Sequence, residues 1–124
     1  MIQVMVVDDH AILVDGLTHL INESGFATVM GVAYTGKSCM ELLRQQQPEV
    51  LLLDINLPDV SGLDLCKTIK GQYPAIRVVA LTSYSEYAMV RQMLENGASG
   101  YVIKNAMPDE ILMSIRVVHE GELF

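Results

Sequence analysis

Short apolar segments alternate along the chain with longer segments whose apolar residues recur at helical spacing. The apolar segments are rich in β-branched residues and have the length of buried strands, at 2–7, 28–34, 50–53, 76–81 and 101–103. Each is followed by a segment that predicts a helix, around 13–21, 38–46, 63–69 and 86–95 and from 108 onward. The hydrophobic pattern therefore predicts five strands that alternate with five helices.

This alternation indicates an α/β fold, in which helices cover both faces of a parallel sheet. The chain has 124 residues, the size of one domain, so we interpret 1–124 as a single unit. For this size we predict a flavodoxin-like (βα)5 doubly wound parallel sheet with the strand order 2-1-3-4-5. Ligands of such sheets bind beyond the carboxyl ends of the strands, near the switch point between the first and third strands.

Composition and charge exclude several classes of protein. Hydrophobic residues make up 51% of the chain, which is ample for a packed core, and the net charge of −7 argues against binding nucleic acid without a partner domain. No apolar run has the length of a membrane span, and the amino terminus lacks the basic region of a secretory signal. Cys39 and Cys66 form no CxxC motif, so we predict buried free thiols in a cytoplasmic protein.

Chemically active residues stand at the ends of four predicted strands. Asp8 and Asp9 follow the first strand, Asp54 the third, Thr82 the fourth and Lys104 the fifth. Alone, the acid pair, Thr82 and Lys104 have ordinary explanations as loop acids, a helix cap and a surface lysine. Asp54 is harder to explain in this way, because it directly follows four buried apolar residues. Together they converge on one rim of the sheet, where mutually repelling carboxylates favour a bound Mg²⁺ ion with room for a phosphoryl group. The sequence therefore predicts a phosphoryl-transfer site.

A second stretch suggests different chemistry. GVAYTGKS at 31–38 matches the P-loop pattern G-x-x-x-x-G-K-[ST], and VLLLD at 50–54 resembles the strand and aspartate that hold magnesium in nucleotidases. However, the start of this stretch is predicted to be an edge strand, whereas a phosphate cradle needs a loop whose amides turn inward. We therefore interpret the match as accidental, with Lys37 and Ser38 at the start of a surface helix. A small Mg²⁺-dependent P-loop nucleotidase remains an alternative.

Four motifs in order resemble the receiver domains of two-component response regulators over essentially the whole chain. The motifs are VVDDH at 6–10, LLLDINLPDVSGLDL at 51–65, ALTSYS at 80–85 and ENGASGYVIKNA at 95–106. Their style is similar to receivers joined to a C-terminal LuxR-type helix-turn-helix. The resemblance implies a signalling module that accepts a phosphoryl group from a sensor histidine kinase and controls a transcriptional output domain absent from this chain.

The resemblance also implies the roles of the residues at the strand ends. Asp54 is the phosphoacceptor. Asp8, Asp9 and the backbone carbonyl of Asn56 join Asp54 in binding Mg²⁺, and Lys104 contacts the phosphoryl group. An aspartyl-phosphate phosphatase, a further alternative, would usually have a second acid where this chain has Asn56, which argues against a turnover enzyme. A receiver that acts without phosphorylation is a third possibility, and the intact set of residues argues against it.

The resemblance further implies that Thr82 is the switch hydroxyl and Tyr101 the switch aromatic, which together pass the signal to the surface. Phosphorylation is expected to change self-association of the face built from the fourth helix, which includes Tyr87, the fifth strand and the fifth helix. DNA would be contacted only through another domain, and no membrane contact is expected. Asn105 replaces the proline that follows the lysine in many receivers, so we expect a trans bond there. We interpret His10 as a residue that opens the first helix.

Overall fold

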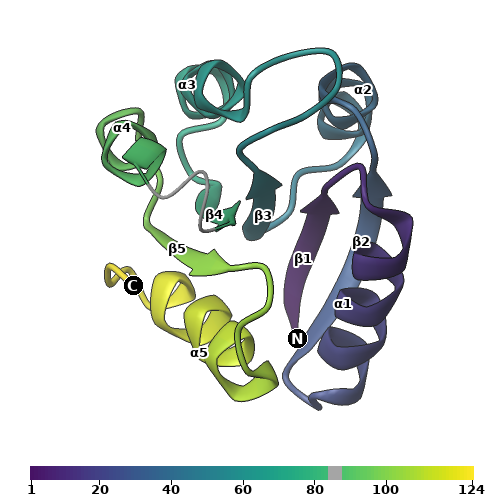
Figure 1. Cartoon of the computed structure of the whole chain (residues 1–124). Coiled ribbons are helices and arrows are strands. Elements are labelled where there is room, and N and C mark those ends of the chain that lie inside the picture. Colours follow the sequence, from purple (N-terminus) through teal and green to yellow (C-terminus); the bar gives the residue numbers. More distant parts are fainter. Residues whose placement is uncertain (84–87) are drawn as a thin grey trace.

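The computed structural model describes residues 1–83 and 88–124 and contains a parallel sheet with helices on both sides (Figure 1). The strands are β1 (Ile2–Val7), β2 (Ala27–Ala33), β3 (Val50–Asp54), β4 (Arg77–Thr82) and β5 (Gly100–Ile103). In the described ranges they form one sheet with the order β2-β1-β3-β4-β5, every neighbouring pair parallel. The predicted flavodoxin-like topology is confirmed.

The helices divide into two layers. They are α1 (Ala11–Glu23), α2 (Gly36–Gln45), α3 (Gly62–Gln72), α4 (Val90–Glu95) and α5 (Pro108–His119). Figure 1 shows α1 and α5 against one face of the sheet and α2, α3 and α4 against the other. None of these helices, within the part of the chain that the structure describes, combines the length and apolar character needed to cross a lipid bilayer.

The position of β3 in the middle of the sheet explains why its sequence is apolar without alternation. Leu51 and Leu53 lie in the core beneath α2 and α3, whereas Val50 and Leu52 lie in the core beneath α1 and α5. Successive side chains of a strand point to opposite faces, and both faces are covered here. Asp54 is the last residue of β3 and is also fully buried. A carboxylate therefore ends the most enclosed strand.

The predicted boundaries differ from the observed ones mainly at two helices. The structure starts α2 at Gly36 rather than at residue 38, because Thr35 caps the helix by accepting a hydrogen bond from the Ser38 amide. The predicted helix at 86–95 is described only in part, since α4 begins at Val90 and residues 84–87, including Tyr87, lie outside the described residues. Pro108 opens α5 as predicted.

The two thiols are buried and unreactive. Cys39 lies on α2 and Cys66 on α3, both fully enclosed and both free. Burial raises the pKa of Cys39 to about 12 and that of Cys66 to about 11. Thiolates are the reactive form of cysteine, so these residues serve as small apolar side chains. The prediction of buried free thiols is confirmed.

Candidate phosphoryl-transfer site

Parallel strands bring the predicted residues to one rim of the sheet. Asp8 directly follows β1, Asp54 and Thr82 end β3 and β4, and Lys104 directly follows β5. The side chains of Asp8, Asp54 and Thr82 are fully buried. Asp9 is more exposed, with 38% of its side-chain surface accessible. The topology thus gathers three acids, a hydroxyl and a lysine in a partly enclosed site.

Each buried carboxylate has one engaged oxygen and one open oxygen. Oδ1 of Asp54 accepts a hydrogen bond of 3.0 Å from the backbone amide of Asn56 and lies 3.0 Å from Nζ of Lys104. Oδ1 of Asp8 accepts a hydrogen bond of 2.8 Å from the backbone amide of His10 and lies 2.7 Å from Nδ1 of the His10 ring. Oδ2 of Asp54 and Oδ2 of Asp8 have no hydrogen-bond partner among the residues described, although the latter lies 3.2 Å from Lys104. We call these two atoms the open oxygens.

The open oxygens make the site suitable for a divalent cation. A buried carboxylate oxygen without a partner is costly in free energy, and a cation removes that cost. Asp8, Asp9, Asp54 and His10 each offer a ligand atom, and these atoms lie within 4.8 Å of one another. Lys104 brings one positive charge to the two carboxylates of Asp8 and Asp54, so a charge deficit remains that a dication would balance. The residues therefore fit Mg²⁺, a hard cation that prefers oxygen ligands.

Burial shifts the pKa of the central carboxyl. It raises the pKa of Asp54 from 3.8 to about 6, against the lowering effects of the Asn56 amide and Lys104, and the nearby Asp8 charge raises it further. Burial lowers the pKa of Lys104, but its hydrogen bond to Asp54 and its charge attraction to both Asp54 and Asp8 outweigh burial and leave this pKa raised. At neutral pH the site therefore holds an ionised but poorly stabilised Asp54 beside a charged lysine.

The loop after β3 is folded back tightly beside Asp54. The Gly62 amide donates a 2.7 Å hydrogen bond to the Ile55 carbonyl, and Ser61 caps α3 by accepting from the Leu63 amide at 3.1 Å. A Cβ atom at position 62 would lie only 2.2 Å from the carbonyl oxygen of Asp54 and 2.6 Å from the Ile55 Cα. Only glycine allows this approach, which holds the backbone around Asp54 in place.

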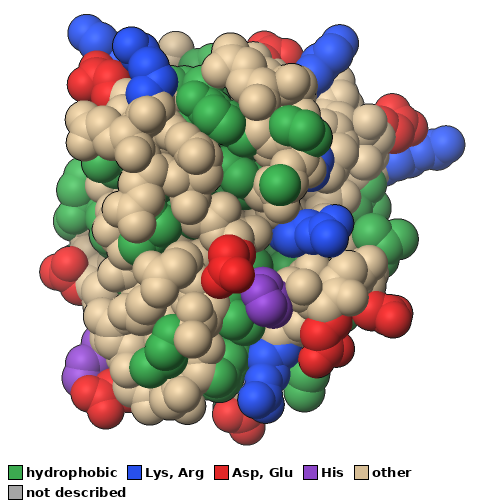
Figure 2. Space-filling view, turned by 180° about the vertical axis from the view of Figure 1, so that it is seen from behind, with side chains coloured by type: hydrophobic (Ala, Val, Ile, Leu, Met, Phe, Trp, Pro, Cys, Tyr) green, Lys and Arg blue, Asp and Glu red, His purple; other side chains and the backbone are tan. Residues whose placement is uncertain are grey.

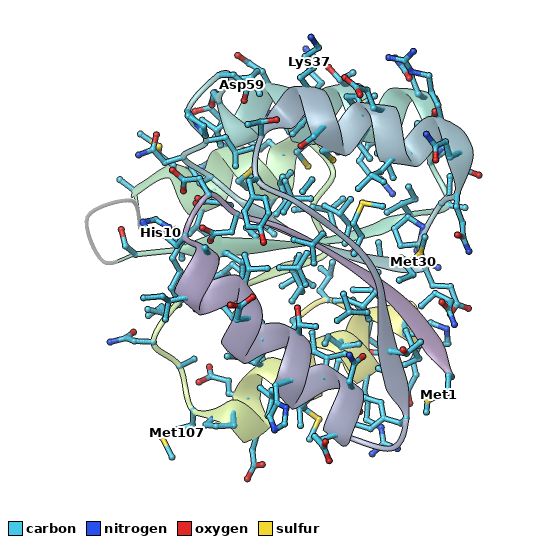
Figure 3. All side chains as sticks on the ribbon, turned by 90° about the vertical axis from the view of Figure 1, so that its right-hand side faces the viewer. Met1, His10, Met30, Lys37, Asp59 and Met107 are labelled. Atoms are coloured by element: carbon cyan, nitrogen blue, oxygen red, sulfur yellow. The ribbon has the colours of Figure 1, made fainter. Side chains whose placement is uncertain are left out.

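The P-loop-like stretch forms no phosphate cradle. Its first residues belong to the edge strand β2, and its last residues start α2. The first two amides of that helix are already engaged, because Asp59 accepts from Gly36 at 2.8 Å and from Lys37 at 3.0 Å. Figure 3 shows Lys37 and Asp59 side by side, well away from His10. The nucleotidase interpretation is not favoured.

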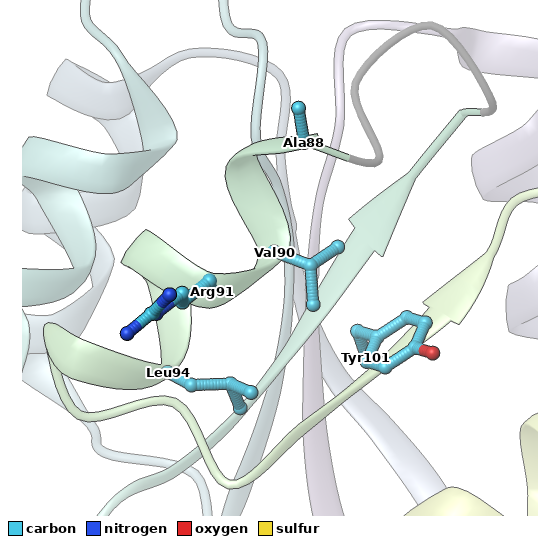
Figure 4. Close-up of a pocket in the computed structure, with 5 residues that line it drawn as sticks. All are labelled: Ala88, Val90, Arg91, Leu94 and Tyr101. Carbon is cyan, nitrogen blue, oxygen red and sulfur yellow. The ribbon is translucent and has the colours of Figure 1, made fainter.

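The predicted switch residues lie on neighbouring strands. Thr82 donates a 3.1 Å hydrogen bond from its hydroxyl to the Ser83 carbonyl, and its own carbonyl accepts from the Lys104 amide at 2.8 Å. Tyr101 is half-buried on β5 and borders a cavity of about 410 Å³ together with Val90, Leu94 and other residues near α4 (Figure 4). The hydroxyl and the aromatic ring thus belong to the two strands that join the rim to the α4 surface.

The ring of His10 is part of the site, which the sequence interpretation missed. His10 does precede α1 as its N-cap residue, as expected, but its ring makes no capping hydrogen bond. Instead, Nδ1 contacts Asp8 and lies 3.2 Å from Oδ1 of Asp9 and 3.4 Å from Nζ of Lys104. The only signal in the sequence was its place directly after the acid pair.

The backbone agrees with one further expectation. The described ranges contain no cis peptide bond, so the bond between Lys104 and Asn105 is trans as predicted. On the face shown in Figure 2, basic and acidic side chains both reach the surface.

Comparisons with known proteins agree with this geometry. The family model "Response regulator receiver domain" matches residues 4–116. The chain is 33% identical to the response regulator GacA of Pseudomonas aeruginosa over 100% of its own length and 58% of GacA. It is 31% identical to the transcriptional regulatory protein LnrK of Bacillus subtilis over 98% of its own length and 55% of LnrK. The chain thus spans little more than half the length of these relatives.

Solved structures give the same result for the fold. A two-component response regulator of the LuxR family from Aurantimonas sp. SI85-9A1 has a TM-score of 0.92 at 28% identity, over 99% of this chain and 88% of that one. A signal receiver domain of NarL from Mycobacterium tuberculosis has a TM-score of 0.90 at 29% identity, over 98% of both chains. The similarity covers the sheet, the helices and the rim that carries the acids.

Proposed function

Because this chain belongs to the response regulator receiver domain family, which acts in two-component signalling by phosphorylation, we propose that Asp54 is its phosphoacceptor. The observation that carries the proposal is the state of this side chain. Asp54 is fully buried at the end of β3, keeps one open oxygen, and has Lys104 at 3.0 Å from the other. Asp8 is also fully buried, but His10 contacts its Oδ1 and Lys104 lies 3.2 Å from its Oδ2, so each of its oxygens has a basic group beside it.

The reaction needs little movement of the protein. A carboxylate oxygen of Asp54 attacks the phosphorus of a kinase phosphohistidine, so that a P–O bond forms, the P–N bond breaks and the departing imidazole takes up a proton. Mg²⁺ held by Asp8, Asp9, Asp54 and the backbone carbonyl of Asn56 would neutralise charge on the phosphoryl oxygens. Lys104, already beside Asp54, supplies a fixed positive charge where the phosphoryl group arrives.

The product is proposed to be stored rather than turned over. A phosphatase of this chemistry would use a second acid two residues after the nucleophile to activate the leaving group or water. That position is Asn56, whose exposed side chain cannot accept or donate a catalytic proton. The domain is therefore proposed to carry one acyl phosphate as a signal, without multiple turnovers.

The signal is proposed to reach the surface of α4, β5 and α5 through Thr82 and Tyr101. The Thr82 hydroxyl donates only to the carbonyl of the next residue in what is described, a bond easily exchanged for a phosphoryl oxygen. Movement of Thr82 would leave room for the Tyr101 ring, which borders the cavity under α4 (Figure 4). Two packings of one region would thus be biased by the acyl phosphate.

The partners in this proposal are a sensor histidine kinase and a second copy of the domain. Exposed Arg91 and Glu95 on α4 form an ion pair of 3.4 Å and present both charge signs, which suits pairing across a two-fold axis. Transcriptional control is proposed for a longer, cytoplasmic regulator in which 1–124 is the receiver domain and a separate domain binds DNA. The lengths of the curated relatives agree with such an arrangement.

The test is incubation with Mg²⁺ and acetyl phosphate followed by intact mass measurement. We expect the wild type to gain one phosphoryl group and Asp54→Asn to gain none. Asp59→Asn is the matched control, because it makes the same change in an acid that lies outside the site. Equal labelling of Asp54→Asn and wild type would show that the phosphoacceptor is another residue.

A further inference from the structure

His10 adds an imidazole nitrogen to the acidic site. Its Nδ1 is 2.7 Å from Oδ1 of Asp8 and 3.2 Å from Oδ1 of Asp9. The ring is not needed to start α1, since it makes no capping hydrogen bond, and 62% of the side chain is exposed. The ring therefore serves the acidic site, through its contact with Asp8, rather than the start of α1.

The spacing of these atoms suits one small metal ion. The separations of 2.7 and 3.2 Å between Nδ1 and Oδ1 of Asp8 and Asp9 are those of a hydrogen bond and an ion pair. Neighbouring ligands of a tetrahedral zinc-type ion, each about 2.0–2.1 Å from the ion, lie about 3.3–3.4 Å apart. A small outward shift of the ring would therefore turn these contacts into ligand positions.

A second observation comes from the other side of the cluster. The open oxygens of Asp8 and Asp54 belong to fully buried side chains, and neither oxygen has a hydrogen-bond partner in the described structure, although that of Asp8 lies 3.2 Å from Lys104. Nδ1 or Nε2 of His10 and one oxygen from each acid lie within 4.8 Å of one another. The cluster therefore combines oxygen atoms that need a cation with a nitrogen that a hard cation does not require.

We propose that His10 is a ligand in this site for first-row transition ions of the zinc type, and that it sets the preference of the site for such ions over Mg²⁺. Imidazole suits zinc and its neighbours, whereas Mg²⁺ prefers oxygen ligands and keeps several waters. The inference rests on the proposed function in one respect only: the same acidic side chains serve as ligands in both. An ion that is held by His10 in addition to the acids competes with Mg²⁺ and leaves fewer coordination positions open for a phosphoryl oxygen.

The experiment compares Zn²⁺ and Mg²⁺ binding by calorimetry on the full chain. We expect His10→Ala to lower the Zn²⁺ affinity about tenfold or more, as loss of a ligand should do at least as much as loss of a supporting contact. The Mg²⁺ affinity should change less than about twofold, since Mg²⁺ does not require the nitrogen. His19→Ala, a change of an exposed histidine on α1, is the matched control and should alter neither value.

A second variant separates ligation from simple support of Asp8. His10→Gln keeps a hydrogen-bond donor for Asp8 but lacks the imidazole, so it should lose the Zn²⁺ preference as His10→Ala does. Visible absorption of the Co²⁺-loaded protein should also shift in both His10 variants and not in His19→Ala. Full Zn²⁺ affinity in His10→Gln, or an equal loss for both ions in His10→Ala, would overturn the inference.

These results are independent of phosphoryl transfer. Wild type that binds Zn²⁺ through His10 but gains no phosphoryl group with Mg²⁺ and acetyl phosphate would refute the proposed phosphoacceptor and leave the metal preference standing. Wild type that is phosphorylated at Asp54 but whose Zn²⁺ affinity does not depend on His10 would refute the metal preference alone.

Discussion

The sequence suggests two regions of this molecule that could bind a phosphate group, and only one of them has unsatisfied polar atoms in the structure. At the start of α2, the amides of Gly36 and Lys37 could bind an anion, but the carboxylate of Asp59 accepts from both. At the rim of the sheet, the open oxygens of Asp8 and Asp54 have no such partner in the described ranges. The comparison shows that unsatisfied polar groups, rather than a matching motif, distinguish a binding site.

The largest difference should appear between the two lysines of these regions. Lys104→Ala should lower the initial rate of acyl phosphate formation about 10²–10³-fold, since it removes a fixed charge beside the acceptor. Lys37→Ala should leave the rate unchanged. Mass spectrometry over time with Mg²⁺ and acetyl phosphate measures both. Circular dichroism is the control for folding, because Lys104 also pairs with buried acids. Similar rates in both variants would remove the distinction between the regions.

Metal binding should sharpen the same contrast. Asp9→Ala should weaken Mg²⁺ binding about tenfold or more, because one of a few carboxylate ligands is lost. Asp59→Ala, the matched change at the start of α2, should leave Mg²⁺ affinity unchanged. Calorimetric titration at neutral pH checks both values. An unaltered affinity in Asp9→Ala would exclude this acid from the ligands.

The contributions of Asp54 and Asp59 to the stability of the fold should change with pH in opposite directions. The pKa of Asp54 is raised by burial to about 6, so in the absence of metal the folded state binds the proton more tightly than the unfolded state. Its contribution to stability is then full below pH 3.8 and is lost as the pH rises through about 6. Asp54→Asn should therefore be more stable than wild type at pH 7.5, on the order of 1–3 kcal/mol. The advantage should vanish near pH 4.

Urea unfolding in EDTA at the two pH values measures this difference. Saturating Mg²⁺ should reduce it at pH 7.5, because the cation stabilises the ionised carboxylate in the wild type. A wild type as stable as Asp54→Asn at pH 7.5 without metal would mean that Asp54 is better solvated than its burial indicates.

The smallest effect is expected at Asp59. The amides of Gly36 and Lys37 lower its pKa, so its contribution to stability is present above its ordinary value of 3.8 and is lost as the pH falls below it. Asp59→Asn should therefore lose a little stability at neutral pH, and the loss should shrink as the pH falls below 3.8. ATP should still not bind to Asp59→Asn, because β2 is followed by no loop whose amides turn inward. Calorimetric binding of ATP by this variant would revive the P-loop interpretation.

Much of the site could be predicted because it depends on strand register. Asp54 and Thr82 are marked by the apolar runs before them, and a parallel sheet brings all strand ends to one edge. The contact of Asp59 with Gly36 could not be predicted, since the residues are 23 apart in sequence and no local pattern joins them. The direction of the His10 ring was likewise hidden, because it depends on the three-dimensional positions of Asp8 and Asp9.

Gly62 has a consequence for how this sequence can vary. A methyl group there would meet the main chain of Asp54 and Ile55, which cannot move without displacing the buried strand β3. In a library of random codons, position 62 would retain a single amino acid, although it carries no functional group. Exposed Pro58 in the same loop faces no such constraint. The region is therefore least tolerant of mutation at a residue that takes no part in its chemistry.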